Sequence, residues 1–114
     1  MPLDGWVSTE VTALLRHARS LIPAPLWVKG SMHAGASSVR HCSMGALVTA
    51  LVEADLYKAD MAMARHHLDA AARMRGFHGI IHMNDADETT HGDLMAAWDD
   101  AIAMSKGVMI HVTG

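Results

Sequence analysis

Apolar side chains recur every three or four residues in four separate stretches of this chain, and that spacing constrains the fold more than any other feature. It is the spacing of an α-helix that buries one side in a protein core. We expect the four stretches to form helices at residues 8–22, 38–56, 58–75 and 90–106. Such a core would be filled mostly by Ala, Leu and Met, because 51% of the chain is apolar but only 4% is aromatic.

Residues that begin or end helices stand at the expected positions. Pro23 follows the first stretch and would end that helix, because its ring disfavours the helical conformation in the preceding residue. Gly76 and Gly107 follow the third and fourth stretches, where glycine often closes a helix in the left-handed conformation. Thr90 and Asp93 have the spacing of a capping box, in which each side chain accepts a hydrogen bond from the other residue's amide.

The end of the chain follows a different pattern, because apolar residues occupy every second position at 108–113. A period of two predicts a β-strand. A single strand needs a neighbour for its backbone amides, and the candidates are residues 26–29, residues 80–83 and the same tail of a second chain. Pairing between two copies would give a two-fold homodimer. Its interface residues would be Val108, Ile110 and Val112.

The predicted fold is therefore mainly α: a compact bundle of about four helices with a short C-terminal strand. A chain of 114 residues has the length of one domain. Because no linker or internal repeat divides it, we expect a single helical domain over residues 1–114 with a strand-like tail.

The composition argues against two classes of partner. The formal net charge is −3 and the basic residues are scattered, whereas proteins that bind nucleic acid through phosphates cluster Lys and Arg. No apolar run reaches the roughly 18 residues of a membrane span, and the N-terminus lacks the pattern of a signal peptide. We therefore expect no nucleic-acid partner, no membrane partner and a cytoplasmic location.

Cys42 is the only cysteine, so the chain forms no internal disulfide. Its neighbour His41, when cationic, would lower the pKa of the thiol and activate it. The position of Cys42 on the apolar side of the predicted second helix favours a buried packing residue instead.

Side chains that bind metals or transfer protons are concentrated between residues 78 and 91. The candidates are His78, His82, Asp85, Asp87 and His91. Imidazole with carboxylate suits zinc, nickel or iron, and a His–Asp pair suits general acid–base catalysis. The segment lacks a metal-site spacing such as His-Glu-x-x-His, and the chain has no nucleophile elbow or phosphate-binding loop. We therefore predict no catalytic residue, no metal and no cofactor.

The simpler interpretation is that this polar segment leads into the fourth helix. Asn84 and Asp85 have side chains that close turns by binding nearby backbone, so we predict a structural turn at these two residues. Asp87 and Glu88 would place negative charge before the helix that starts at Thr90, where the helix dipole favours it.

Five short segments together have a distinctive pattern: residues 18–22, Trp27 with Gly30, and residues 42–47, 83–85 and 94–101. They resemble a family of small helical proteins of unknown function from actinobacteria and their phages. That family has a Cys-x-x-Gly-Ala helix and a Trp-Asn-Asp turn. This chain departs from the pattern at Met83, where the family often has Trp, and at Pro25 and Leu26, where it often has Gly. The resemblance implies a shared architecture but assigns no activity to any residue.

Two functions fit these observations. The first is a non-enzymatic protein-interaction module, for example a phage accessory protein that binds a bacterial host factor. The absence of a catalytic motif supports it, as does a strand-like tail that would add to a sheet in a partner. The second is a small-ligand or metal-dependent protein, for example a hydrolase, that uses His82, Asp85, Asp87 and His91. We expect the first.

Overall fold

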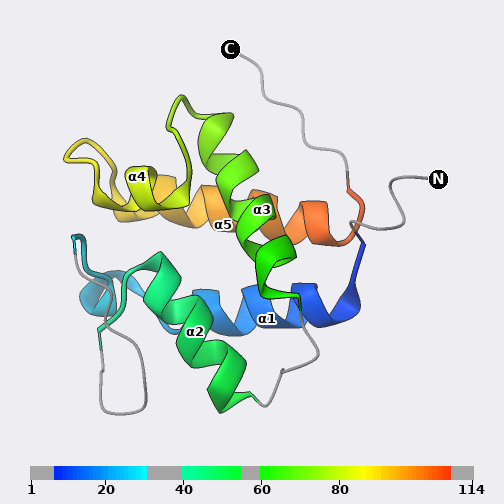
Figure 1. Cartoon of the computed structure of the whole chain (residues 1–114). Coiled ribbons are helices and arrows are strands. Elements are labelled where there is room, and N and C mark those ends of the chain that lie inside the picture. Colours follow the sequence, from blue (N-terminus) through cyan, green and yellow to red (C-terminus); the bar gives the residue numbers. More distant parts are fainter. Residues whose placement is uncertain (1–6, 31–39, 55–59, 109–114) are drawn as a thin grey trace.

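The computed structural model of the chain describes residues 7–30, 40–54 and 60–108, and these form five α-helices and one short 3-10 helix (Figure 1). The α-helices are α1 (Thr9–Ser20), α2 (Ser43–Glu53), α3 (Met61–Arg73), α4 (Ile80–Asp85) and α5 (His91–Ser105), and the 3-10 helix is η2 (Ala24–Leu26). The prediction of a mainly α fold is confirmed. No helix in these three ranges has the length and apolar character needed to cross a bilayer.

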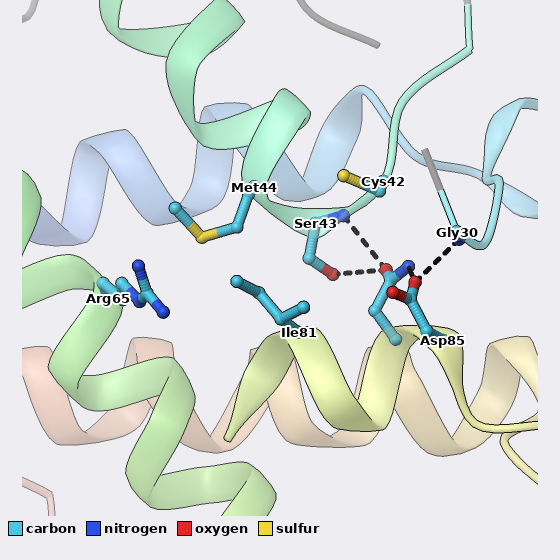
Figure 2. A pocket seen from close by; sticks show the side chains of 8 residues that line it. Gly30, Cys42, Ser43, Met44, Arg65, Ile81 and Asp85 are labelled. Atoms are coloured by element: carbon cyan, nitrogen blue, oxygen red, sulfur yellow. Dashed lines mark hydrogen bonds between the residues drawn. The ribbon is translucent and has the colours of Figure 1, made fainter. Parts of the chain in front are cut away.

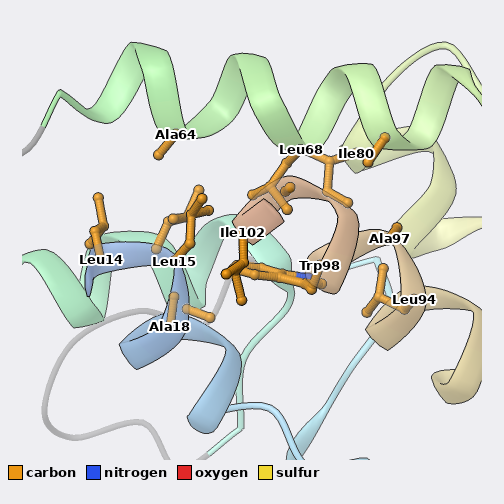
Figure 3. Packing of buried hydrophobic residues seen from close by; sticks show 14 of the residues in the cluster. Leu14, Leu15, Ala18, Ala64, Leu68, Ile80, Leu94, Ala97, Trp98 and Ile102 are labelled. Atoms are coloured by element: carbon orange, nitrogen blue, oxygen red, sulfur yellow. The ribbon is translucent and has the colours of Figure 1, made fainter. Parts of the chain in front are cut away.

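The helices pack around one core. Helix α5 contacts α1 and α3, helix α2 packs on α1, and the short α4 contacts both α2 and α3. Figure 3 shows side chains of α1, α3 and α5 converging on Trp98 and Ile102. Trp98 is fully buried, and so are the small residues Ala64 and Ala97. Small side chains at these positions let the helices approach closely while the indole fills the space between them.

The sequence signals at the helix ends act as predicted. Gly76 (φ 90°) and Gly107 (φ 79°) adopt the left-handed conformation after α3 and α5. The Thr90 hydroxyl accepts a hydrogen bond from the Asp93 amide at 3.1 Å, and the Asp93 carboxylate accepts one from the Thr90 amide at 3.3 Å. All of these interactions join residues close in sequence, which is why the sequence alone predicts them.

The predicted start of the second helix is wrong, because α2 begins later, at Ser43. His41 is extended, and its amide and carbonyl bind the backbone of Leu26 and Val28 at 3.0 and 3.1 Å. These long-range bonds keep His41 out of the helix. Cys42 consequently caps α2 and does not lie within it, and its Sγ accepts a hydrogen bond from the third amide of the helix.

The predicted turn at Asn84 and Asp85 is corrected to a short helix, since both are residues of α4. The sequence gives little sign of α4, because Gly79 precedes it and has no side chain to cap it. Asp69 of α3 supplies the missing interaction: its Oδ1 accepts a hydrogen bond from the Ile80 amide at 2.8 Å. A cap that comes from another helix leaves no local sequence pattern.

The predicted C-terminal strand is not supported. Residues 109–114, including Ile110 and Val112, lie outside the described residues, and the described ranges contain no strand. Val108 is described; it follows the left-handed Gly107 and is 50% exposed. The interface at Val108, Ile110 and Val112 therefore stays a prediction.

Candidate functional site

Asn84 is the centre of a buried hydrogen-bond network at the end of α4. Its Oδ1 accepts three hydrogen bonds, from Trp27 Nε1 at 2.8 Å and from the amide and hydroxyl of Ser43 at 3.0 and 2.8 Å. Its Nδ2 donates to the Val28 carbonyl at 3.1 Å and to Asp85 Oδ1 at 2.9 Å. One side chain thereby joins the start of α2, the end of α4 and the segment after η2.

The network continues into the core through Ser43. This residue is 1% exposed, and its hydroxyl accepts a hydrogen bond from Trp98 Nε1 at 3.3 Å while it donates to Asn84. The polar atoms of the two indoles, Trp27 and Trp98, are therefore both satisfied. Because a buried polar group without a partner costs about 1–3 kcal/mol, this connected set favours one arrangement of the helices.

Lys29 and Gly30, which follow Trp27, bind the C-terminal end of α4. The Gly30 amide donates to Asp85 Oδ1 at 2.8 Å. Lys29 Nζ donates to the Ala86 carbonyl at 2.6 Å, at the C-terminal end of α4, where the helix dipole favours a cation. The Lys29 ammonium also lies 5.4 Å from the centre of the Trp27 ring. The end of α4 is thus held in place by both side-chain and backbone contacts.

A pocket of about 330 Å³ opens beside this network, between α2, α3 and α4 (Figure 2). It is lined by Gly30, Cys42, Ser43, Met44, Arg65, Ile81, Asn84 and Asp85. Met44 and Ile81 face each other across it, with Arg65 on one side of Ile81 and Asp85 on the other. The volume falls at the lower end of the roughly 300–1,000 Å³ typical of ligand pockets.

The two candidate nucleophiles that line the pocket, Cys42 and Ser43, both take part in hydrogen bonds. The Ser43 hydroxyl donates to Asn84 Oδ1 and accepts from Trp98 Nε1. Cys42 is 8% exposed, and its sulfur accepts a hydrogen bond from the Gly45 amide at 3.4 Å. Both candidate nucleophiles among the lining residues therefore have structural roles.

The predicted metal and acid–base histidines are engaged elsewhere. His82 Nδ1 accepts a hydrogen bond from the His78 amide at 3.0 Å, and the two rings stack with centroids 4.8 Å apart. His91 Nε2 donates to the Ile22 carbonyl at 2.8 Å, in the connection after α1. The His82 and His91 imidazoles thus bind backbone groups, and the His78 ring stacks on that of His82.

The two predicted carboxylates, Asp85 and Asp87, have different surroundings. Asp85 lines the pocket and binds the Gly30 amide, whereas Asp87 is exposed and its backbone carbonyl accepts from Lys29 at 3.3 Å. The part of the chain that the structure describes contains no group of three or more His, Cys, Asp or Glu side chains placed to hold a metal ion.

Sequence reasoning missed two residues of the pocket wall. Arg65 of α3 and Ile81 of α4 lie outside the five short segments that the sequence singled out, whereas Met44 belongs to the Cys-x-x-Gly-Ala segment. Ile81 is 45% exposed, which departs from the usual burial of isoleucine, but this exposure becomes visible only in the fold.

Comparison with known protein families matches residues 7–104 to a family of unknown function, DUF6197. The chain belongs to this family. The match includes every residue that lines the pocket, and membership of a family without an assigned activity agrees with the resemblance seen in the sequence. No curated protein and no solved structure shows a significant match to the chain.

Proposed function

We propose that this protein is a non-enzymatic interaction module that binds another protein by taking one of its apolar side chains into the pocket between α2, α3 and α4. The observation that carries the proposal is an apolar-walled pocket built on a frame of satisfied, buried hydrogen bonds. Rigid pockets of this kind receive the few anchor side chains that dominate the energy of most protein interfaces.

The walls of the pocket fit an aliphatic or aromatic anchor. Ile81 is 45% exposed and Met44 is partly buried, so an inserted side chain would remove apolar surface of both residues from water. Each Å² of apolar surface buried contributes about 25 cal/mol. Methionine is unbranched and polarizable, which lets Met44 adapt to anchors of different shape.

Within this proposal the partner is a bacterial host factor, and the protein is a phage accessory protein that acts in the host cytoplasm. This part rests on the resemblance of the short segments to actinobacterial and phage proteins. A homodimer formed through residues 108–113 belongs to the same proposal, supported by the alternation of those residues.

The test is capture from actinobacterial lysate with three tagged proteins: the unchanged chain, Ile81→Glu and Val52→Glu. Val52 is a matched control, because it is a branched apolar residue of α2 that is 57% exposed and lies outside the pocket. We expect one protein in near-equal amount with the unchanged chain and Val52→Glu, and its loss with Ile81→Glu. Equal capture by all three proteins, or capture by none, would contradict the proposal.

A small-ligand protein is the second candidate, favoured by the pocket volume and by Asp85, the one lining residue that belongs to the cluster predicted from the sequence. A ligand at a hundred times its dissociation constant adds about 2.7 kcal/mol of stability. Thermal melting against a set of small organic compounds would reveal such a shift. A shift that Ile81→Glu abolishes and Val52→Glu retains would place the ligand in the pocket.

A further inference from the structure

The two charged groups at the edges of the pocket differ in how they are engaged. Asp85 Oδ1 accepts hydrogen bonds from the Gly30 amide at 2.8 Å and from Asn84 Nδ2 at 2.9 Å, so this oxygen of the carboxylate already has two donors. Arg65 projects from α3 beside Ile81, and its side chain is 48% exposed. The pocket is therefore open to a new ion pair mainly at its Arg65 side.

The contact that Arg65 makes with its own helix is a loose one. Its Nε lies 3.5 Å from Asp69 Oδ2, beyond the usual length of a charge-assisted hydrogen bond. The other oxygen of Asp69 accepts the Ile80 amide at 2.8 Å and holds the start of α4. Since Asp69 is committed to α4, the outer nitrogens of the guanidinium fork are suited to an added carboxylate.

We propose, on the basis of the interaction function above, that the partner segment carries an acidic side chain directly beside its apolar anchor. The anchor lies between Met44 and Ile81, and the Asp or Glu of the partner pairs with Arg65. An arginine fork matches the two oxygens of a carboxylate, so this pair fixes the direction in which the segment crosses the pocket.

The amides at the start of α2 favour an acidic side chain over a free chain terminus. A terminal carboxylate needs free backbone amides to receive it. The Ser43 amide already donates to Asn84 and the Gly45 amide to the Cys42 sulfur, so the first turn of α2 offers no pair of adjacent free amides to a terminal carboxylate. The charge therefore enters at Arg65, on the rim of the pocket, and not at the helix start.

The net charge of −3 opposes an acidic partner only weakly. Charges farther apart than about 8 Å are largely screened at physiological salt, whereas the contact with Arg65 is direct. The net charge would slow association, and the local pair would still decide which sequence binds.

The test selects random peptides displayed as fusions whose C-terminus is joined to a carrier protein, so that carboxylates come only from Asp and Glu. The baits are the unchanged chain, Arg65→Glu, Ile81→Glu and Arg16→Glu. Arg16 is an exposed residue of α1 outside the pocket lining, so Arg16→Glu makes the same change in net charge elsewhere.

We expect the unchanged chain and Arg16→Glu to enrich peptides in which an apolar residue adjoins Asp or Glu. The preference for the acidic neighbour should fall about fivefold with Arg65→Glu, the discrimination that an ion pair at an exposed rim provides. Two results would overturn this inference and leave the interaction function standing. In the first, apolar peptides depend on Ile81 but show no preference for an acidic neighbour. In the second, the acidic preference is present but Arg65→Glu retains it. No enrichment that depends on Ile81 would overturn both.

Discussion

Replacing Asn84 with leucine should destabilise the protein strongly, although the two side chains have the same number of non-hydrogen atoms and the same branching. The change removes the acceptor of the Ser43 amide and of Trp27 Nε1 and the donor to the Val28 carbonyl. Ser43 is 1% exposed, so water cannot replace the lost partner of its amide, while Trp27 is only partly buried. At about 1–3 kcal/mol for each stranded buried group, the loss is on the order of 3–5 kcal/mol.

Such a loss is a large part of the 5–15 kcal/mol by which a domain of this size is usually stable. Urea unfolding followed by circular dichroism measures it. With a slope of about 2 kcal/mol per molar urea, the midpoint should fall by roughly 2 M. Asp87→Asn is the control, because Asp87 is exposed and should shift the free energy of unfolding by less than about 0.5 kcal/mol. A loss below about 1 kcal/mol for Asn84→Leu would refute the central role given to this amide.

A second substitution separates hydrogen bonding from packing. Asn84→Asp keeps an oxygen for Trp27 and Ser43 but replaces the donor nitrogen with an oxygen that faces the Val28 carbonyl and Asp85 Oδ1. The new oxygen then faces two other acceptors, and the new carboxylate repels the negative charge of Asp85. We expect a loss at least as large as with leucine, and one that salt reduces less than it would at an exposed site. A variant as stable as the unchanged chain would show that the donor side of the amide contributes little.

Three further predictions follow from other parts of the fold. Gly76→Ala should lower the melting temperature by about 4–8 °C, because a residue with a β-carbon loses about 1 kcal/mol in the left-handed conformation at φ 90°. Gly92→Ala, in the first turn of α5, should raise it, because the added Cβ would meet Thr90 Oγ1 at an ordinary contact distance of 3.9 Å. EDTA or added zinc should leave the melting temperature unchanged; an upward shift with zinc would restore the metal hypothesis for the histidines. Removing residues 108–114 should convert a dimer to a monomer in light scattering if the tail pairs two copies, and an unchanged mass would refute that pairing.

The parts of the fold that local sequence determines were predictable. The ends of α3 and α5 depend on Gly76 and Gly107, which lie next to the helices they close. The start of α2 was not predictable, because His41 is held extended by residues that precede it by more than ten positions. Helix α4 was missed for the same reason, since Asp69 on another helix supplies its cap.

The candidate site was less predictable than the fold. Asn84 and Asp85 stood out in the sequence, but as residues of a turn, and only the packed helices show that Asn84 binds residues 41 and 57 positions away. Nothing in the sequence marked Arg65 and Ile81 as pocket residues, because a pocket wall forms from the side of a helix that other helices leave uncovered after packing. Periodicity predicts the buried side of a helix and says little about the remainder.

The position of Asn84 beside the pocket couples stability to the proposed binding. The same amide lines the pocket and joins the start of α2 to the end of α4, so the distance between Met44 and Ile81 depends on it. A peptide that binds the pocket at a hundred times its dissociation constant should stabilise the unchanged chain by about 2.7 kcal/mol. Asn84→Asp should bind that peptide more weakly even where it remains folded, because its pocket walls are no longer held at one separation. Equal affinity for the folded variant and the unchanged chain would separate the two roles and show that the pocket keeps its shape without the network.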